Sequence, residues 1–384
     1  MSNVLDAGIP VVDGSVERRA VAVASSDSSE SFVGGNAGCA IPRAAKSITK
    51  VGIVGCGYWG PKLARNFHDL KGARLSSICD FREDRLRHMK ELYPDAATTR
   101  DYQELLDSDV DAVVIATPVS KHHPLAMRAL RAGKHVLVEK PLAASSAEAA
   151  EIARTADELG LAAMVGHTFL FNPAVVAVRK VLDEGRVGQV YYLNGMRLNL
   201  GLLQPDINVI WDLAPHDLSI LLYLLGAEPL RVSATGEAFI RRGTSLHELA
   251  FLRLEFPNNV QASLQVSWLD PVKVRRLTIV GSKGMLVYDD IAENKVVLMD
   301  KGVDIPPYSD TLEQFQMSYR HGPEVPVAVE WSEPLKIECQ AFVDWIQTGQ
   351  RAPSDAWLGT KVVRILETAQ RSLRNGGVPL EVEL

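Results

Sequence analysis

Short apolar runs rich in β-branched residues alternate with amphipathic stretches between residues 50 and 166. Helical periodicity begins near residues 61, 83, 122 and 147, and the apolar runs lie at residues 50–55, 73–80, 111–117, 134–140 and 161–166. Continuous apolar strands separated by helices are typical of a parallel sheet with both faces covered. The pattern predicts an N-terminal, doubly wound α/β domain over residues 47–168.

The periodicity changes after residue 168. Helices are expected at residues 173–184 and 211–225, with a strand between them. Short turns then separate runs of alternating polarity at residues 230–240, 249–256, 260–268, 274–281, 284–290 and 295–300. Consecutive strands joined by short turns favour an antiparallel sheet. Residues 169–384 are therefore predicted to form a C-terminal α+β domain.

Two segments lack a sustained period. Residues 1–46 are rich in Ser, Gly, Ala and Val, a composition that buries too little surface to offset the entropy of ordering, so a disordered leader is expected. Residues 302–331 contain several prolines and are expected to form a long surface arm.

Two helices are predicted to close the chain. The first covers residues 334–348, and the second, at about 357–375, is followed by Gly376 and Gly377 as a C-cap. The second helix is a candidate for packing back on the N-terminal domain.

Composition excludes several classes of partner. The 384 residues carry a net charge of −6 with no long basic run, whereas nucleic-acid binding requires clustered Lys and Arg. No apolar stretch approaches the roughly 18 to 20 residues of a membrane span. The four cysteines form no CxxC pair, which favours reduced thiols. We expect a cytoplasmic protein that binds neither nucleic acid nor membranes.

A glycine-rich loop follows the first predicted strand. Gly55, Gly57 and Gly60 form GxGxxG before a helix, a pattern that lets the backbone and the helix N-terminus approach a pyrophosphate. S-adenosylmethionine enzymes have similar loops, so a methyltransferase is an alternative. Asp80, at the end of the second strand, favours NAD, because a carboxylate there can hold ribose hydroxyls and repel a 2′-phosphate. Arg82, two residues further on, weakens this preference, so NADP is an alternative cofactor.

Polar residues end the later strands of the predicted parallel sheet. Because ligands bind at the carboxyl ends of such strands, a single crevice should contain five of them: Thr117, Pro118, His122, Glu139 and Lys140. In the second domain, Asp212 and His216 lie four residues apart and so share one helix face. A neutral imidazole can accept an alcohol proton, and Asp212 can orient it or bind substrate hydroxyls. No third ligand accompanies this pair, so no metal is expected.

The motifs GCGYWG, ATPVSKH, EKP and DLAPHD, in this order, resemble the glucose-fructose oxidoreductase / inositol dehydrogenase / MocA (Gfo/Idh/MocA) family. The resemblance implies a Rossmann domain followed by a large open, mostly antiparallel sheet that mediates a homodimer or homotetramer. It also implies that Lys140 is the catalytic lysine, that His216 with Asp212 handles the proton, and that Tyr58 and Trp59 belong to the NAD site.

Within the family, GHTFLFNPAV and WDLAPHDLSIL resemble members acting on nucleotide-linked sugars, including UDP-N-acetylglucosamine 3-dehydrogenases. This implies NAD(P)-dependent hydride transfer at C3 of a hexose, with candidate substrate contacts at His167, Asn172, Arg197 and Asn199. A dehydrogenase of free sugars or inositols and a non-catalytic NAD-dependent sensor are the alternatives. The chain departs from many members at Ser219, where they have Asp, and in the PDINVIW segment before Asp212.

Overall fold

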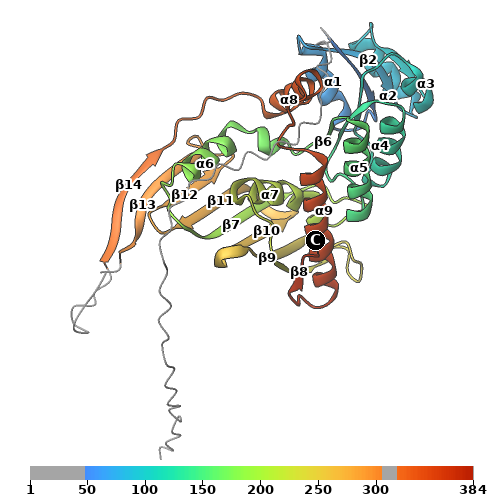
Figure 1. The fold of residues 1–384 in the computed structure, drawn as a ribbon. Coiled ribbons are helices and arrows are strands. Elements are labelled where there is room, and N and C mark those ends of the chain that lie inside the picture. The colour runs from blue at the N-terminus through green and yellow to red at the C-terminus, as the bar shows by residue number, and fades with distance from the viewer. Residues whose placement is uncertain (1–47, 305–317, 384) are drawn as a thin grey trace, which may run out of the picture. The chain divides into compact units, whose positions relative to one another are not determined.

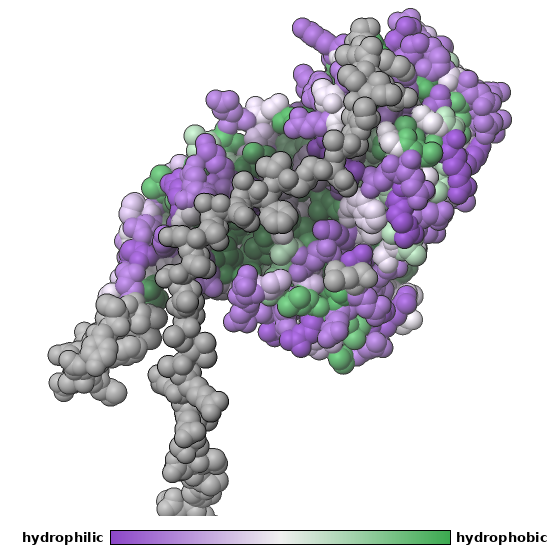
Figure 2. Space-filling view, viewed as in Figure 1, coloured by the Kyte–Doolittle hydropathy of each residue, from purple (hydrophilic) through white to green (hydrophobic). Residues whose placement is uncertain are grey.

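The computed structural model describes residues 48–304 and 318–383. The predicted leader at residues 1–46 lies outside this part. The described chain forms two separate sheets with helices packed on them (Figure 1). In the view of Figure 2, hydrophilic residues dominate the surface around the parallel sheet, and hydrophobic residues gather in a hollow near the large sheet.

The N-terminal sheet has six parallel strands in the order β3-β2-β1-β4-β5-β6. The strands are β1 (Thr49–Val54), β2 (Ala73–Cys79), β3 (Ala97–Thr99), β4 (Ala112–Ile115), β5 (His135–Val138) and β6 (Ala163–Val165). The helices between them are α1 (Gly60–Asp69), α2 (Glu83–Leu92), α3 (Tyr102–Asp107), α4 (His122–Arg131) and α5 (Ser146–Leu159). This is the predicted doubly wound arrangement, because strands such as β4 are buried along their whole length.

The C-terminal sheet has nine strands in the order β14-β13-β12-β11-β7-β10-β9-β8-β15. They are β7 (Val190–Leu200), β8 (Arg231–Glu237), β9 (Leu249–Glu255), β10 (Gln261–Ser267), β11 (Leu269–Gly281), β12 (Met285–Asp289), β13 (Val296–Asp304), β14 (Ser318–Pro326) and β15 (Leu380–Glu381). Among the described strands of this sheet, only β7 and β10 pair in parallel. The large, mostly antiparallel sheet expected from the family resemblance is confirmed.

One face of the large sheet is covered by α6 (Pro173–Asp183), α7 (Val209–Leu225) and α9 (Ala356–Arg374). Buried and exposed side chains alternate along β9, with Ala250, Leu252 and Leu254 under the helices and Phe251 on the open face. This period of two arises because successive side chains of a strand point to opposite faces.

The prediction of a surface arm at residues 302–331 is wrong for residues 318–326, which form β14 and pair with β13. Proline and charge conceal this strand in the sequence. An edge strand tolerates both, because one side of its backbone needs no partner. Residues 305–317 lie outside the described part. The short elements β3, α3 and β15 were also missed.

The last two helices pack against the N-terminal domain (Figure 1). Helix α8 (Pro334–Thr348) lies on α1, where the rings of Phe67 and Phe342 meet edge to face with centroids 6.4 Å apart. Helix α9 packs along α5 and α7, and Asp355 just before it bridges to Met164 of β6. The N-terminal core is therefore built from both ends of the described chain.

This packing predicts the effect of truncating Phe342, which is fully buried. Phe342→Ala should lower the free energy of unfolding by about 3–5 kcal/mol, because a large cavity would open between α1 and α8. Urea denaturation followed by circular dichroism measures the change. Phe342→Leu, which refills most of the volume, should lose clearly less, and equal stability of wild type and Phe342→Ala would contradict this account.

Candidate functional site

The glycine loop lies between β1 and α1 and has room for a pyrophosphate. Gly55 has a positive φ of 95°, and an added Cβ would lie 2.5 Å from the carbonyl oxygen of Ala116. A Cβ on Gly60 would lie 2.0 Å from the carbonyl oxygen of Gly55, so both positions require glycine. A Cβ on Gly57 would meet nothing within 4 Å. No side chain caps the N-terminus of α1, and the N–H groups of Lys62 and Leu63 donate to the carbonyl oxygen of Trp59, so the positive end of the helix dipole is what favours an anion here.

Asp80, at the end of β2, fixes this loop. Its Oδ2 accepts from the backbone N–H of Cys56 at 2.6 Å, and its Oδ1 accepts from that of Arg82 at 2.8 Å. A carboxylate has about four acceptor positions, so capacity remains for ribose hydroxyls. The guanidinium of Arg82 pairs with Asp84 at 2.6 Å on the surface. The arrangement fits NAD, because Asp80 would repel a 2′-phosphate and Arg82 already has a carboxylate partner.

His122 joins the ends of two neighbouring strands. One ring nitrogen lies 2.8 Å from the carbonyl oxygen of Thr117, after β4, and the other lies 2.8 Å from that of Pro141, after β5. The side chain is 1% exposed. Its place is therefore beneath the crevice, where it holds the two strand ends together, while Pro118 is exposed beside them.

Lys140 reaches from the end of β5 to α7 of the C-terminal domain. Its Nζ donates to the carbonyl oxygen of Asp212 at 2.8 Å and to Asp212 Oδ1 at 3.2 Å. Asp212 Oδ2 accepts from Trp268 Nε1 at 3.1 Å. An ammonium group has three donors, so one N–H of Lys140 remains for a ligand. Pro215, inside α7, cannot donate to the carbonyl of Trp211, which weakens helical hydrogen bonding at the turn that carries Asp212.

His216 lies one turn after Asp212. Its ring meets that of Phe169 at a centroid distance of 5.1 Å. Burial lowers the pKa of His216 well below its usual value, and the positive charges of Lys140 and Arg197 lower it further. The imidazole is therefore neutral at neutral pH and able to accept a proton. Ser219 donates to the carbonyl oxygen of His216 at 2.8 Å.

Two buried carboxyl groups, those of Glu139 and Glu338, lie near Lys140 and near each other. Burial raises the pKa of Glu139, at the end of β5, to about 7, although Lys140 lowers it. Glu338 of α8 is fully buried, and burial together with the charge of Glu139 raises its pKa well above the usual value. Glu338 Oε2 accepts from Thr168 Oγ1 at 2.9 Å. Burial of His167 lowers its pKa to about 3.

Several buried polar atoms around this centre have no hydrogen-bond partner within the described residues. They are Thr117 Oγ1, both ring nitrogens of His167, Nδ1 of His216 and Oε1 of Glu338. Buried polar groups are normally paired, so unpaired ones that gather in one place indicate where a ligand supplies the partners. The residues present therefore fit a nicotinamide cofactor and a polar substrate.

The candidate substrate contacts have different surroundings. Asn172 caps α6 through the N–H of Ala174 and donates to Asp290 at 3.0 Å. The guanidinium of Arg197 forms a buried ion pair with Asp217 at 2.6 Å. Asn199 is half-buried on the same face of β7 as Arg197. The structure thus engages Asn172 and Arg197 in internal contacts.

A cavity of about 690 Å³ opens beside His216. Its lining comes from the start of α1, from the segment after β6, from β11 and from the segment before α8. It includes Trp59, Lys62, Thr168, Phe169, Asn172, Arg275, Asp290 and Trp331. The cavity therefore connects the glycine loop with the proposed proton acceptor, as a substrate site requires.

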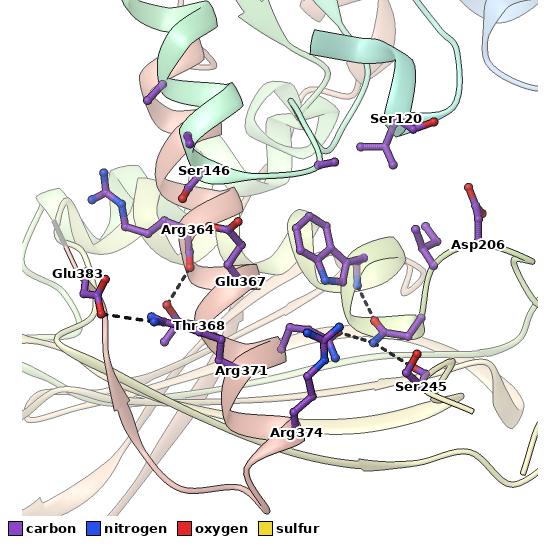
Figure 3. A pocket seen from close by; sticks show the side chains of 18 of the residues that line it. Ser120, Ser146, Asp206, Ser245, Arg364, Glu367, Thr368, Arg371, Arg374 and Glu383 are labelled. Carbon is purple, nitrogen blue, oxygen red and sulfur yellow. Dashed lines mark hydrogen bonds and ion pairs between the residues drawn. The ribbon is translucent and has the colours of Figure 1, made fainter. Parts of the chain in front are cut away.

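A second cavity, of about 1050 Å³, lies between α5, α9 and the segment before α7 (Figure 3). Its lining includes Arg364, Arg371 and Arg374 of α9 together with Ser146 and Asp206, and Arg371 pairs with Glu383. Asn208, at its base, caps α7 through the N–H of Ile210 and donates to Gln370 Oε1 at 2.6 Å. This link attaches the start of α7 to α9.

Sequence reasoning missed several members of the site. Trp268 fixes Asp212, Phe169 contacts His216, and Glu338 lies beside Glu139. Trp268 and Glu338 lie outside the motifs GCGYWG, ATPVSKH, EKP and DLAPHD, so only the fold brings them to the site. Lys62 could have been predicted from the sequence, because it follows the last glycine of the loop by two residues and so lies on the first turn of α1.

Fold and site together define a two-domain, dinucleotide-binding oxidoreductase. Residues 49–167 match the oxidoreductase family with an NAD-binding Rossmann fold, and residues 175–287 match the Gfo/Idh/MocA C-terminal domain. The chain therefore belongs to the Gfo/Idh/MocA family. This confirms the predicted family, the fold and an NAD-dependent dehydrogenase. In residues 48–304 and 318–383 no helix is long and apolar enough to cross a membrane.

Curated relatives and solved structures resemble most of the chain. The scyllo-inositol 2-dehydrogenase (NAD⁺) of Bacillus subtilis is 25% identical over 345 residues, which cover 86% of this chain and 96% of that protein. The UDP-N-acetylglucosamine 3-dehydrogenase of Acidithiobacillus ferrooxidans is 32% identical over 237 residues, covering 60% and 70%. A crystal structure of the latter aligns with a TM-score of 0.71 at 25% identity, covering 85% and 98%.

The raised pKa of Glu139 predicts a pH-dependent stability. A folded-state pKa of about 7, against 4.5 for an ordinary Glu, means that its contribution is present below pH 4.5 and is lost as the pH rises through 7. Glu139→Gln should reduce the loss of unfolding free energy between pH 5 and pH 7.5 by about 1–3 kcal/mol. Urea denaturation at both pH values measures this. The exposed Glu158→Gln serves as the control, and equal slopes for both variants and wild type would refute the prediction.

Proposed function

We propose that this enzyme transfers a hydride between a secondary hydroxyl or keto group of a sugar and nicotinamide, preferentially at C3 of a nucleotide-linked hexose. The observation that supports the proposal most is the convergence of Lys140, Asp212 and His216 beside unpaired buried polar atoms. These residues come from two domains, and His216 also lines the cavity that reaches the start of α1.

His216 is assigned as the base of the oxidation. The pKa of its imidazole is lowered by burial, so a neutral ring faces the cavity and can take the hydroxyl proton. In the reverse direction the same ring returns the proton to the alkoxide oxygen. NAD held at the glycine loop would supply the hydride acceptor or donor, while the oxygen stays on the substrate and the hydroxyl proton moves to or from His216.

Lys140 is assigned to the same oxygen. Two of its three donors are taken by Asp212, so the third can donate to the substrate oxygen and stabilise negative charge as the proton leaves. Asp212 holds the ammonium in place and is itself held by Trp268. We place Gly55, Gly57, Gly60, Asp80 and Thr117 at the cofactor.

The substrate class rests on the relatives and on the cavity. Relatives named as inositol dehydrogenases and as a UDP-N-acetylglucosamine 3-dehydrogenase support a polyhydroxylated ring. The cavity beside His216 has about 690 Å³, which exceeds the volume of one pyranose and leaves room for an attached group. This favours a nucleotide-linked sugar over a free sugar or inositol, which remains the alternative.

We also propose that the open face of the large sheet mediates a homodimer or homotetramer. Tyr192 of β7 and Phe251 of β9 are about half exposed and share the face that the helices leave open, and apolar side chains gathered on one face typically mark an interface. The predicted cytoplasmic location stays a prediction.

The assignment of the catalytic pair predicts the behaviour of two variants. Lys140→Met and His216→Ala should each lower kcat/KM for the sugar substrate about 10²–10⁴-fold, because each removes a group that acts on the reacting oxygen. Spectrophotometric NADH assays measure turnover, and calorimetry should show that NAD still binds.

The exposed Lys71→Met and His88→Ala are the matched controls and should keep wild-type kinetics. Wild-type turnover of Lys140→Met or His216→Ala with the same substrate would overturn the assigned roles. Binding of NAD without turnover of any sugar, inositol or sugar nucleotide would favour the sensor alternative.

The proposed interface predicts that Phe251→Arg dissociates the assembly, because a charge buried there would have no partner. Size-exclusion chromatography with light scattering should show a smaller species for this variant, while the exposed Glu158→Arg on α5 should leave the mass unchanged. An unchanged mass for Phe251→Arg would place the interface elsewhere.

A further inference from the structure

Lys62 brings a positive charge to the cavity beside His216. It lies on the first turn of α1, with its Nζ 3.7 Å from the centroid of the Tyr58 ring and 4.7 Å from that of Trp59. In the described part of the chain, no carboxylate forms an ion pair with Lys62. The aromatic rings hold the ammonium by cation–π attraction, and the Tyr58 hydroxyl engages one of its three donors, so two donors are left for a ligand.

Arg275 brings a second positive charge from β11. It is opposite Arg197 of β7 in the strand register, so both side chains lie on the sheet face that is covered by the helices. Arg275 Nη1 donates to Asp290 Oδ2 at 3.2 Å, and its side chain is 36% exposed. The pKa of the Tyr58 hydroxyl is lowered mainly by Lys62, with a smaller effect of Arg275, so the two cations act on the same region.

The carboxylates of this cavity are already engaged. Asp290 accepts from Arg275, from Asn172 at 3.0 Å and from the hydroxyl of Tyr288 at 3.1 Å. Glu333 pairs with Arg65. The negative charges therefore position their partners, whereas Lys62 and the remaining N–H groups of Arg275 are available to an anion.

The cavity walls are aromatic at both ends. Phe169 lies next to His216 at the inner end, and Tyr93 and Trp331 line the remainder. Trp331 is 56% exposed, which places it at the mouth. Aromatic rings of this kind stack on nucleobases, with a contribution of about 1–3 kcal/mol per base.

We propose that this cavity binds the nucleoside diphosphate part of the substrate, with the diphosphate on Lys62 and Arg275 and the base against Tyr93 or Trp331. The sugar then lies between this anion site and His216. The inference rests on the proposed function, which supplies the sugar and its reaction. It adds the residues that would select a nucleotide-linked sugar over a free one.

The test uses UDP as the probe, titrated by calorimetry into the full chain saturated with NAD. Lys62→Ala and Arg275→Ala should each weaken UDP binding about 10-fold or more, because each removes a charged donor to phosphate. Steady-state assays with a UDP-hexose should show a similar rise in KM with little change in kcat. Affinity for NAD should not change.

Arg276→Ala is the matched control. Arg276 is the next residue of β11, has the same side chain, pairs with Asp289 at 2.8 Å and lies on the opposite face of the sheet. The affinity of the Arg276→Ala variant for UDP should stay within twofold of the wild-type affinity. Arg275→Gln keeps a hydrogen-bond donor for Asp290 while removing the charge, so it should also lose affinity if the fold around Asp290 is undisturbed.

Equal UDP affinity in wild type, Lys62→Ala and Arg275→Gln would overturn the proposal. So would a parallel loss of NAD affinity in Lys62→Ala, because the lysine would then serve the cofactor. Failure of the proposed function is separate: UDP binding that depends on Arg275 without turnover of UDP-hexoses would retain the anion site and refute the assigned reaction. Turnover of UDP-hexoses with a KM that does not change in the Arg275 variants would support the assigned reaction and refute the anion site.

Discussion

The contact between Lys140 and Asp212 is the constraint on which the site depends. It joins the end of a Rossmann strand to the helix that carries His216, so the cofactor domain and the proposed proton acceptor have a fixed separation. Both side chains are largely buried, at 11% and 21% exposure, and a buried ion pair requires further hydrogen bonds to offset desolvation. Trp268 supplies one, and the backbone carbonyl of Asp212 supplies another.

Most of the fold was predictable because its signals are local. Buried strands such as β4 are recognised by a continuous apolar run, and amphipathic helices such as α5 by the helical spacing of their apolar residues. Turn residues mark the ends of the antiparallel strands. The errors fall where local signals are weak. Strand β14 is charged and contains proline, yet it is stabilised by pairing with β13, which is a tertiary effect.

The site was predictable only in part, for a physical reason. Gly55 and Gly60 are required by clashes within a short loop, so a sequence motif records them. Lys140 and His216 belong to motifs, but the distance between them is set by packing across 76 residues of chain. Phe169 and Glu338 act through environment, the first beside the imidazole and the second beside Glu139. Environment of this kind has no spacing rule, since it depends on which elements the fold brings together.

The return of α8 and α9 to the Rossmann domain also bears on how the chain is made. Phe342 completes the packing on α1, and Val363 completes that beside α5, yet both lie more than 170 residues after the last Rossmann strand. During synthesis the parallel sheet emerges first with apolar faces that lack their final cover. The cofactor domain can therefore reach its full stability only after α8 and α9 have been synthesised, so its maturation depends on residues that follow most of the C-terminal sheet.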